Sequence, residues 1–181
     1  MNFFNSQLLG VDEEVVASIT PSIDIQRANG GSALADERHA VWGMLIRDSA
    51  WDYPMTFETP VPLWPATLAV NARAAIRTQY RMDGGSIRHW IEVSTVATSW
   101  ERLKVAAGEF DALRVERLIR LEHHDHLRAW TTRRDLMWLA PEVGRWVARE
   151  TSGQYVLRGE NRFWESQSSE DRIRWELTAW H

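Results

Sequence analysis

Hydrophobic and polar residues alternate with a period of two through much of the C-terminal half of the chain. In the segment DRIRWELTAW, Ile173 and Trp175 fall on one side, whereas Arg174 and Glu176 fall on the other. Successive side chains of an extended chain point to opposite faces, so this period is typical of a strand with one buried and one solvated face. We therefore predict that this C-terminal segment is a β-strand.

Two earlier segments alternate in the same way but carry polar residues on an apolar side. In FDALRVERLIRL, Arg117 interrupts an apolar side, and such an interruption indicates a curved sheet or a polar cavity. In HLRAWTTRRDLMWLAP, one side mixes large rings with polar groups, and Pro141 ends the strand. The mixed side consists of Trp130, Thr132, Arg134, Leu136 and Trp138; the interrupted side consists of Leu113, Val115, Arg117, Ile119 and Leu121.

Turn-forming residues separate these segments at regular intervals. Strands joined by short turns run antiparallel, and spacings of about 8–15 residues favour a meander that closes into a barrel or curls as a half-barrel. We expect about six to eight strands after residue 60. The turns are DGG at 83–85, AAGEF around Gly108, HHDH at 123–126, PEVG at 141–144, SG at 152–153 and SQSSE at 166–170.

The N-terminal third is less regular. EVVASIT and HAVWGMLIR have the pattern of strands, and WDYPMTFETPVPLWP should be extended because it holds four prolines. The segment at 66–82 fits a short helix by its alanines and a bent strand by its alternation. The predicted fold class is mainly β. We expect one domain over 1–181, with an extended or capping segment and early strands at 1–60, and a curved antiparallel barrel or half-barrel at 61–181.

Composition and charge exclude several classes of function. The net charge of −4 comes from 21 basic and 25 acidic residues without a basic run, so no nucleic-acid partner is expected. The absence of cysteine excludes disulfides and thiolate chemistry. No apolar stretch reaches the roughly 18 residues that span a bilayer, so no membrane insertion is expected. The N-terminus has no signal-peptide pattern; we expect a cytoplasmic monomer or homodimer, or a periplasmic one if a signal peptide was removed.

Tryptophan is unusually abundant, with eleven residues in 181. Each indole can bury up to about 200 Å² and carries an N–H group that needs a hydrogen-bond partner, so these rings suit a partly wet cavity. They suit the core and rim of a barrel equally well. If they line a cavity, the expected ligand is a hydrophobic or aromatic small molecule, and the candidate ligand-binding residues are Trp90, Trp130, Arg134, Trp138, Trp146 and Trp175.

Two motifs in this half of the chain carry a family resemblance. WERLKVAAGEFDALRVER, followed by an aromatic-rich strand and by MWLAPEVGRWVARE, resembles uncharacterised β-rich bacterial proteins, mostly of the cell envelope, that combine A-G-x-F with W-x-A-P-x-V-G. The resemblance covers residues 87–180 and implies a curved sheet similar to the barrels and half-barrels of lipoprotein carriers. It implies little about chemistry, because Gly108, Phe110, Pro141 and Gly144 have simple roles in turns and packing.

The sequence offers few signs of catalytic chemistry. Motifs for serine hydrolases, phosphate-binding loops and zincins are absent, and HHDH lacks a further ligand for a metal, so we expect no cofactor and no metal. Catalysis would therefore be acid/base or electrostatic, by a group whose pKa the cavity shifts. The candidates are His89, Glu92, Glu116, Asp135 and Tyr155.

Three functional hypotheses follow from these features. The first is a barrel or half-barrel that binds a hydrophobic or aromatic small molecule among tryptophans, oriented by one or two arginines. The second is a cofactor-independent cyclase, isomerase or lyase of secondary metabolism, in which the same cavity folds a flexible substrate and excludes water. The third is a structural or interaction module, which a cavity filled by side chains would favour.

Overall fold

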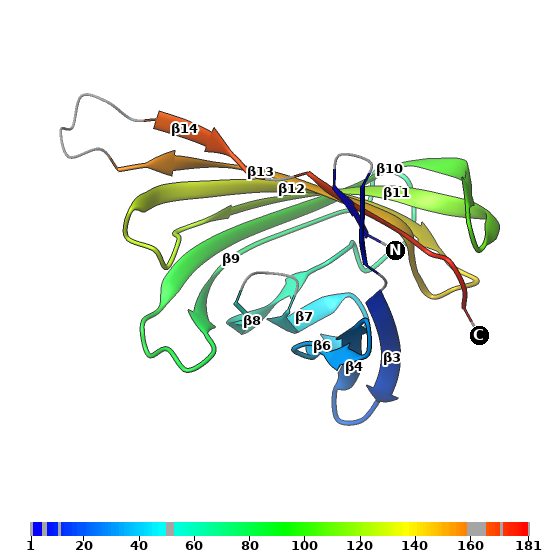
Figure 1. Cartoon of the computed structure of the whole chain (residues 1–181), viewed down its shortest axis with the longest axis horizontal. Helices are drawn as coiled ribbons and strands as arrows, with labels where there is room; N and C mark the ends of the chain where they lie inside the picture. Colours follow the sequence, from blue (N-terminus) through cyan, green and yellow to red (C-terminus); the bar gives the residue numbers. More distant parts are fainter. Residues whose placement is uncertain are drawn as a thin grey trace.

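The computed structural model describes residues 2–4, 7–10, 12–49, 53–158, 166–170 and 172–180. Within these residues every regular element is a β-strand, and fifteen strands form one antiparallel sheet. The sheet is strongly curved, and its long strands arch over the shorter N-terminal strands (Figure 1). Its hydrogen-bonded path has two ends, so the sheet is an open half-barrel, as the alternation and turn spacing predicted.

Thirteen strands follow one another along this hydrogen-bonded path, and two short strands pair beside it. β14 (Ser166–Ser169) pairs with β13, and β5 (Ser32–Ala33) pairs with β4. In order, the path is β2 (Gln7–Gly10), β1 (Asn2–Phe4), β15 (Ile173–Glu176), β13 (Arg145–Leu157), β12 (Arg128–Ala140), β11 (Gly108–Leu121), β10 (His89–Val105), β9 (Arg73–Met82), β8 (Met55–Pro62), β7 (Met44–Asp48), β6 (Glu37–Val41), β4 (Ile23–Asn29) and β3 (Asp12–Ser18).

The two ends of the path are close in sequence. β2 ends at Gly10 and β3 begins at Asp12, although the two strands belong to opposite edges of the sheet. The N-terminal chain therefore passes from one edge to the other with a single residue between them.

The main core fills the concave side of the arch, which we call the inner face. Ile91, Val93 and Val115 point inward from the long strands and pack against Leu45 and Phe57 from the N-terminal strands. Because side chains alternate along a strand, their sequence neighbours point to the opposite, outer face. The inner face is thus the buried one, and burying its apolar side chains supplies the driving force for the arch.

Side chains close the open arch from the N-terminal strands to β13. Trp42, in the turn after β6, donates its Nε1–H to the carbonyl oxygen of Gly144 at 2.7 Å. The Arg145 guanidinium lies 2.5 Å from Glu14 Oε2 on β3 and 3.0 Å from Glu37 Oε1 on β6. These bonds join segments more than 100 residues apart, and they hold the two halves of the sheet at a fixed separation.

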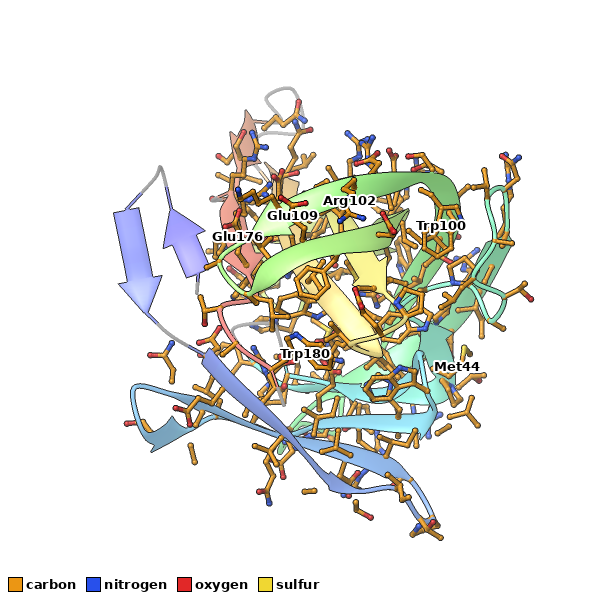
Figure 2. All side chains as sticks on the ribbon, turned by 90° about the vertical axis from the view of Figure 1, so that its right-hand side faces the viewer. Met44, Trp100, Arg102, Glu109, Glu176 and Trp180 are labelled. Carbon is orange, nitrogen blue, oxygen red and sulfur yellow. The ribbon has the colours of Figure 1, made fainter. Side chains whose placement is uncertain are left out.

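A second, smaller core lies on the outer face, under the extended hairpin of β10 and β11. Phe110 and Ala112 from this hairpin cover Trp138 of β12 and Ala148 of β13. Figure 2 shows Arg102 and Glu109 on the hairpin, with Glu176 and Trp180 of the C-terminal segment near its tip. The backbone N–H of Ala107, at the hairpin tip, donates to the carbonyl oxygen of Leu177 at 3.1 Å. The tip therefore contacts the segment that follows β15.

The structure decides one open point of the sequence prediction and corrects another. Of the two alternatives for the segment at 66–82, the strand is the one observed: the segment begins with turns and continues as β9 from Arg73, with Tyr80 in the main core and Ile76 packed against it. Burial of this alternating face outweighs the helix preference of its alanines. The strand predicted for DRIRWELTAW is shorter than expected, because the last strand, β15, ends at Glu176. Seven strands begin after residue 60, within the expected number, and the described residues contain no helix that could cross a membrane.

Candidate binding pocket in the half-barrel

A group of buried charges interrupts the apolar inner face where β11, β12 and β13 run side by side. Arg117 pairs in register with Asp135, and Asp135 pairs with Thr151. Asp135 is fully buried and Arg117 is only 1% exposed. Three guanidinium groups converge on this carboxylate: Arg149 Nη2 at 2.9 Å, Arg133 Nε at 3.0 Å and Arg117 Nη1 at 3.5 Å.

The environment of Asp135 keeps this carboxyl group ionised. Burial by itself would raise its pKa, but Arg133, Arg149 and Arg117 outweigh burial and hold the pKa of Asp135 well below its usual range. Arg117 also donates from Nε to the carbonyl oxygen of Pro62 at 3.1 Å and lies 3.7 Å from Asp48 Oδ2. The network therefore ties β7 and β8 to the centre of the arch.

A second buried group lies beside the first and is internally balanced. The backbone N–H of Gly43 donates to His39 Nδ1 at 3.2 Å, so the ring proton belongs on Nε2, which lies 2.7 Å from Glu37 Oε1. Burial would raise the pKa of Glu37, yet Arg145 and His39 hold it well below its usual range. Glu14, with Arg27 at 3.4 Å, completes the group of two carboxylates and two guanidinium groups.

A pocket of about 390 Å³ opens on the inner face next to the first charged group. We call it the inner pocket. Its walls come from β8, β9, β12, β13 and β15, together with the turn after β11, so the curvature of the sheet creates it. Its described lining residues are Tyr53, Met55, Met82, His123, His124, Arg128, Arg133, Thr151, Ser152, Tyr155, Ser169, Glu170, Ile173 and Trp175.

Aromatic rings and guanidinium groups alternate around the inner pocket. The Arg128 guanidinium carbon lies 4.0 Å from the centre of the Tyr155 ring, and that of Arg149 lies 5.6 Å from the Trp175 ring. Trp175 donates its Nε1–H to Asp12 Oδ2 at 3.1 Å, which satisfies its polar edge and leaves its apolar face for packing. The pocket therefore combines positive charge with flat apolar surfaces.

One carboxylate already sits against a cation of the inner pocket. Glu170 Oε1 lies 3.5 Å from Arg128 Nη1. Glu170 reaches this position because Gly153 lacks a side chain: a Cβ there would overlap the Glu170 carboxylate. The backbone N–H of Glu170 also donates to the Gly153 carbonyl at 2.8 Å, which anchors the segment after β14 over the pocket.

The six predicted ligand-binding residues do not line one cavity. Trp175 lines the inner pocket, whereas Trp90, Trp130 and Arg134 lie on the outer face. Trp138 is buried in the second core, where its Nε1–H donates to Glu101 Oε2 at 2.8 Å. Trp146 packs against the main core. The mixed side of β12 faces outward because its neighbours Arg133, Asp135 and Met137 take the inner positions.

The five catalytic candidates are divided in the same way. Tyr155 lines the inner pocket, and Asp135 lies beneath it in the charged group. Glu92 and Glu116 lie on the outer face, and the His89 ring lies 5.4 Å from that of Tyr80. The enzymatic hypothesis thus retains Tyr155 as its candidate within the pocket and stays a prediction.

Sequence reasoning missed most of the residues that define the inner pocket. The sequence placed Arg128 on the same face as Trp130, but Arg128 lines the inner pocket and Trp130 lies on the outer face. Arg133 and Arg149 were not singled out, although one signal was available. Arg117 interrupts an apolar side, and Arg133 and Asp135 stand two residues apart on the next strand. Charged residues on the apolar sides of two adjacent strands favour a buried ion pair. The sequence does not show that Arg117 lies opposite Asp135, because this depends on the register between β11 and β12.

No family model, curated protein or solved structure matches this chain. By its fold and by the geometry of the inner pocket, the protein is a half-barrel β-protein with a cationic, aromatic pocket on its concave face. The family resemblance of its A-G-x-F and W-x-A-P-x-V-G motifs stays a prediction.

Proposed function

We propose that this protein binds a small anionic molecule with an aromatic or other flat apolar group in the inner pocket. The observation that carries the proposal is the gathering of guanidinium groups at the pocket. Arg128 and Arg133 line the pocket. Arg117 and Arg149 lie beneath it, where they contact Asp135 at 3.5 and 2.9 Å.

Guanidinium groups in the wall of a partly enclosed pocket favour an anionic partner, because hydrogen bonds between ionised groups are stronger than neutral ones. Arg133 lines the pocket and donates its Nε–H to Asp135, so it belongs both to the buried network and to the pocket wall. A guanidinium group offers five donors in a planar fork, which suits this double role.

The remaining walls indicate what else the ligand carries. Trp175 and Tyr155 provide ring faces, and Met55, Met82 and Ile173 provide apolar surface. A volume of about 390 Å³ lies within the size range of small-molecule sites, and mouths of β-barrels are frequent positions for them. The pocket therefore suits a compact aromatic acid better than a long acyl chain.

The position of Glu170 predicts how the inner pocket's affinity for an anion can be increased. Its carboxylate lies beside Arg128, in the position that a ligand anion would share. A negative charge there opposes anion binding by Coulomb repulsion. Replacement of Glu170 by glutamine should therefore strengthen binding of an anion, whereas replacement of an arginine should weaken it.

Isothermal titration calorimetry with 1-naphthoate and its uncharged amide tests the proposal without relying on the fluorescence of eleven tryptophans. We expect the acid to bind at least about tenfold more tightly than the amide, because a hydrogen bond to a charged group contributes about 1.5–3 kcal/mol. Arg133→Gln should remove this preference, and Glu170→Gln should increase affinity for the acid about threefold to tenfold.

Arg134→Gln is the matched control, because Arg134 adjoins Arg133 on β12 but points to the outer face. It should leave affinity for the acid unchanged. Failure of both the parent protein and Glu170→Gln to bind the acid at millimolar concentration would refute the proposal. Equal losses in Arg133→Gln and Arg134→Gln would also contradict it.

A further inference from the structure

The outer face carries a second hollow, independent of the inner pocket. Its floor is a row of register partners across three strands: Ala75 on β9, Ser94 on β10 and Leu118 on β11. Two adjoining hollows of about 570 and 450 Å³ share these three residues. We call this feature the outer trench. It forms because Ala75 and Ser94 in the middle row are small, while arginines and glutamates stand in the rows on both sides.

The walls of the outer trench are charged. One wall is the register row of Arg77, Glu92 and Arg120, and the other contains Arg73 and Glu116. At the β12 end, Arg134 lies opposite Leu118. The lining side chains that point outward include four arginines and two glutamates, a local charge of +2 on a chain whose net charge is −4. This contrast makes the trench an electrostatically distinct surface.

Within the described residues, two of these arginines have no carboxylate neighbour at ion-pair distance, unlike the other two. Arg77 lies 3.5 Å from Glu92, and Arg134 lies 2.9 Å from Glu116. For Arg73 and Arg120, the described part of the chain provides no carboxylate within 4.0 Å. These two guanidinium groups stand at opposite walls of the trench, so they are available to two separate negative charges on an extended ligand.

An aromatic pair, of which Trp130 is exposed and Trp90 half-buried, continues the same face beyond the Arg77 wall. The Trp90 and Trp130 rings are 4.9 Å apart and edge to face, and the Arg77 guanidinium carbon lies 5.5 Å from the Trp90 ring. Trp130 is 52% exposed. A large apolar ring left in solvent beside a charged groove is informative, because an indole face can pack against the C–H groups of a ring-shaped ligand.

The position of the trench limits the class of ligand. It crosses β9, β10 and β11. β10 and β11 pair with strands on both sides there, whereas β9 pairs with β8 only over residues 80–82. A peptide added as a further strand would run along the edge of β9 and would not fill the trench. A nucleic acid carries closely spaced phosphates and needs several neighbouring cations, whereas Arg73 and Arg120 stand apart at opposite walls of the trench. The carboxylates of Glu92 and Glu116 can accept hydrogen bonds from hydroxyl groups, which a sugar chain offers in number.

We propose that the outer trench binds an acidic oligosaccharide. Its sugar rings pack against the Trp90 and Trp130 pair, its carboxylates pair with Arg73 and Arg120, and its hydroxyl groups donate to Glu92 and Glu116. This site brings together five residues that the sequence marked for a single cavity or for catalysis: Trp90, Glu92, Glu116, Trp130 and Arg134.

Calorimetric titration with a hexamer of galacturonic acid tests the proposal, with the neutral hexamer of glucose and a ten-residue oligothymidylate as comparisons. We expect the acidic hexamer to bind and to weaken as salt rises, because screening acts on exposed charges. Trp130→Ala and Arg120→Gln should each reduce its affinity about fivefold to tenfold. Both side chains point outward from the sheet, so circular dichroism should show an unchanged fold.

Arg133→Gln, on the inner face, is the control and should leave binding of the acidic hexamer unchanged. This control also separates the two sites, since the same variant should abolish the preference of the inner pocket for 1-naphthoate. The proposal is overturned if the acidic hexamer does not bind at millimolar concentration, if oligothymidylate binds more tightly, or if Arg133→Gln weakens binding as much as Arg120→Gln does.

Discussion

Substitution of Asp135 by asparagine removes the carboxylate on which three buried guanidinium groups converge, while it keeps the shape of the side chain. Arg133 and Arg149 lie 3.0 and 2.9 Å from Asp135. Arg117 lies 3.7 Å from Asp48 and donates to the carbonyl oxygen of Pro62. Removing one partner of a buried ion pair costs about 3–5 kcal/mol, because the remaining charge stays desolvated. We expect Asp135→Asn to lower the free energy of unfolding by this amount.

Urea denaturation followed by circular dichroism measures this loss. For a chain of this size, a loss of about 3–5 kcal/mol corresponds to a fall in Tm of roughly 6–20 °C. Glu116→Gln is the matched control, since Glu116 also contacts two arginines, at 3.2 and 2.9 Å, but on the outer face. Exposed ion pairs contribute at most about 1 kcal/mol, so the control should lose no more than that.

The pH dependence of stability provides a second, independent test of the role of Asp135. The pKa of Asp135 is lowered in the folded state, whereas the unfolded chain has an ordinary value near about 3.9. Its stabilising contribution is therefore complete above about pH 4 and is lost as pH falls through the folded-state pKa. The difference between the parent protein and Asp135→Asn should shrink steadily below about pH 4. A loss under about 1 kcal/mol at pH 7, or a difference that does not change with acid, would refute this reasoning.

Two further predictions concern the contacts that close the arch. Gly43→Ala should destabilise the protein by about 2–4 kcal/mol in urea denaturation, because Gly43 has a φ of 86° and a Cβ there would overlap the Trp64 indole. Gly84→Ala is the control, because Gly84 has a similar φ of 75° but open space around it, and it should lose only about 1 kcal/mol. Equal losses in the two variants would contradict the predicted overlap with Trp64. Trp42→Phe should cost about 1–2 kcal/mol through loss of the bond to Gly144 and of packing on His39, as measured by the same assay. Trp100→Phe, at an exposed position, should change stability by less than about 0.5 kcal/mol, and an effect as large as that of Trp42→Phe would argue against the closing role of Trp42.

The sequence by itself determined the fold class, because alternation with period two is a local property of each strand. The side chains of β11 illustrate this: Leu113, Val115, Ile119 and Leu121 share a buried face in the structure, with Arg117 among them as the alternation placed it. The turns also followed from local chemistry, and Gly108 and Gly144 both have positive φ angles in the hairpins where they were expected. The resulting expectation of an antiparallel, curved half-barrel is confirmed.

Only the tertiary structure decided which face of each strand is buried and which residues meet. Alternation separates two faces but does not say which one turns inward, and on β12 the inward face carries Arg133 and Asp135 while Trp130 and Arg134 point outward. Likewise, the inner pocket depends on the register between β11, β12 and β13 and on contacts from Glu170 and Trp175. These positions result from sheet curvature and long-range pairing, which depend on the whole chain and have no signature within a single segment.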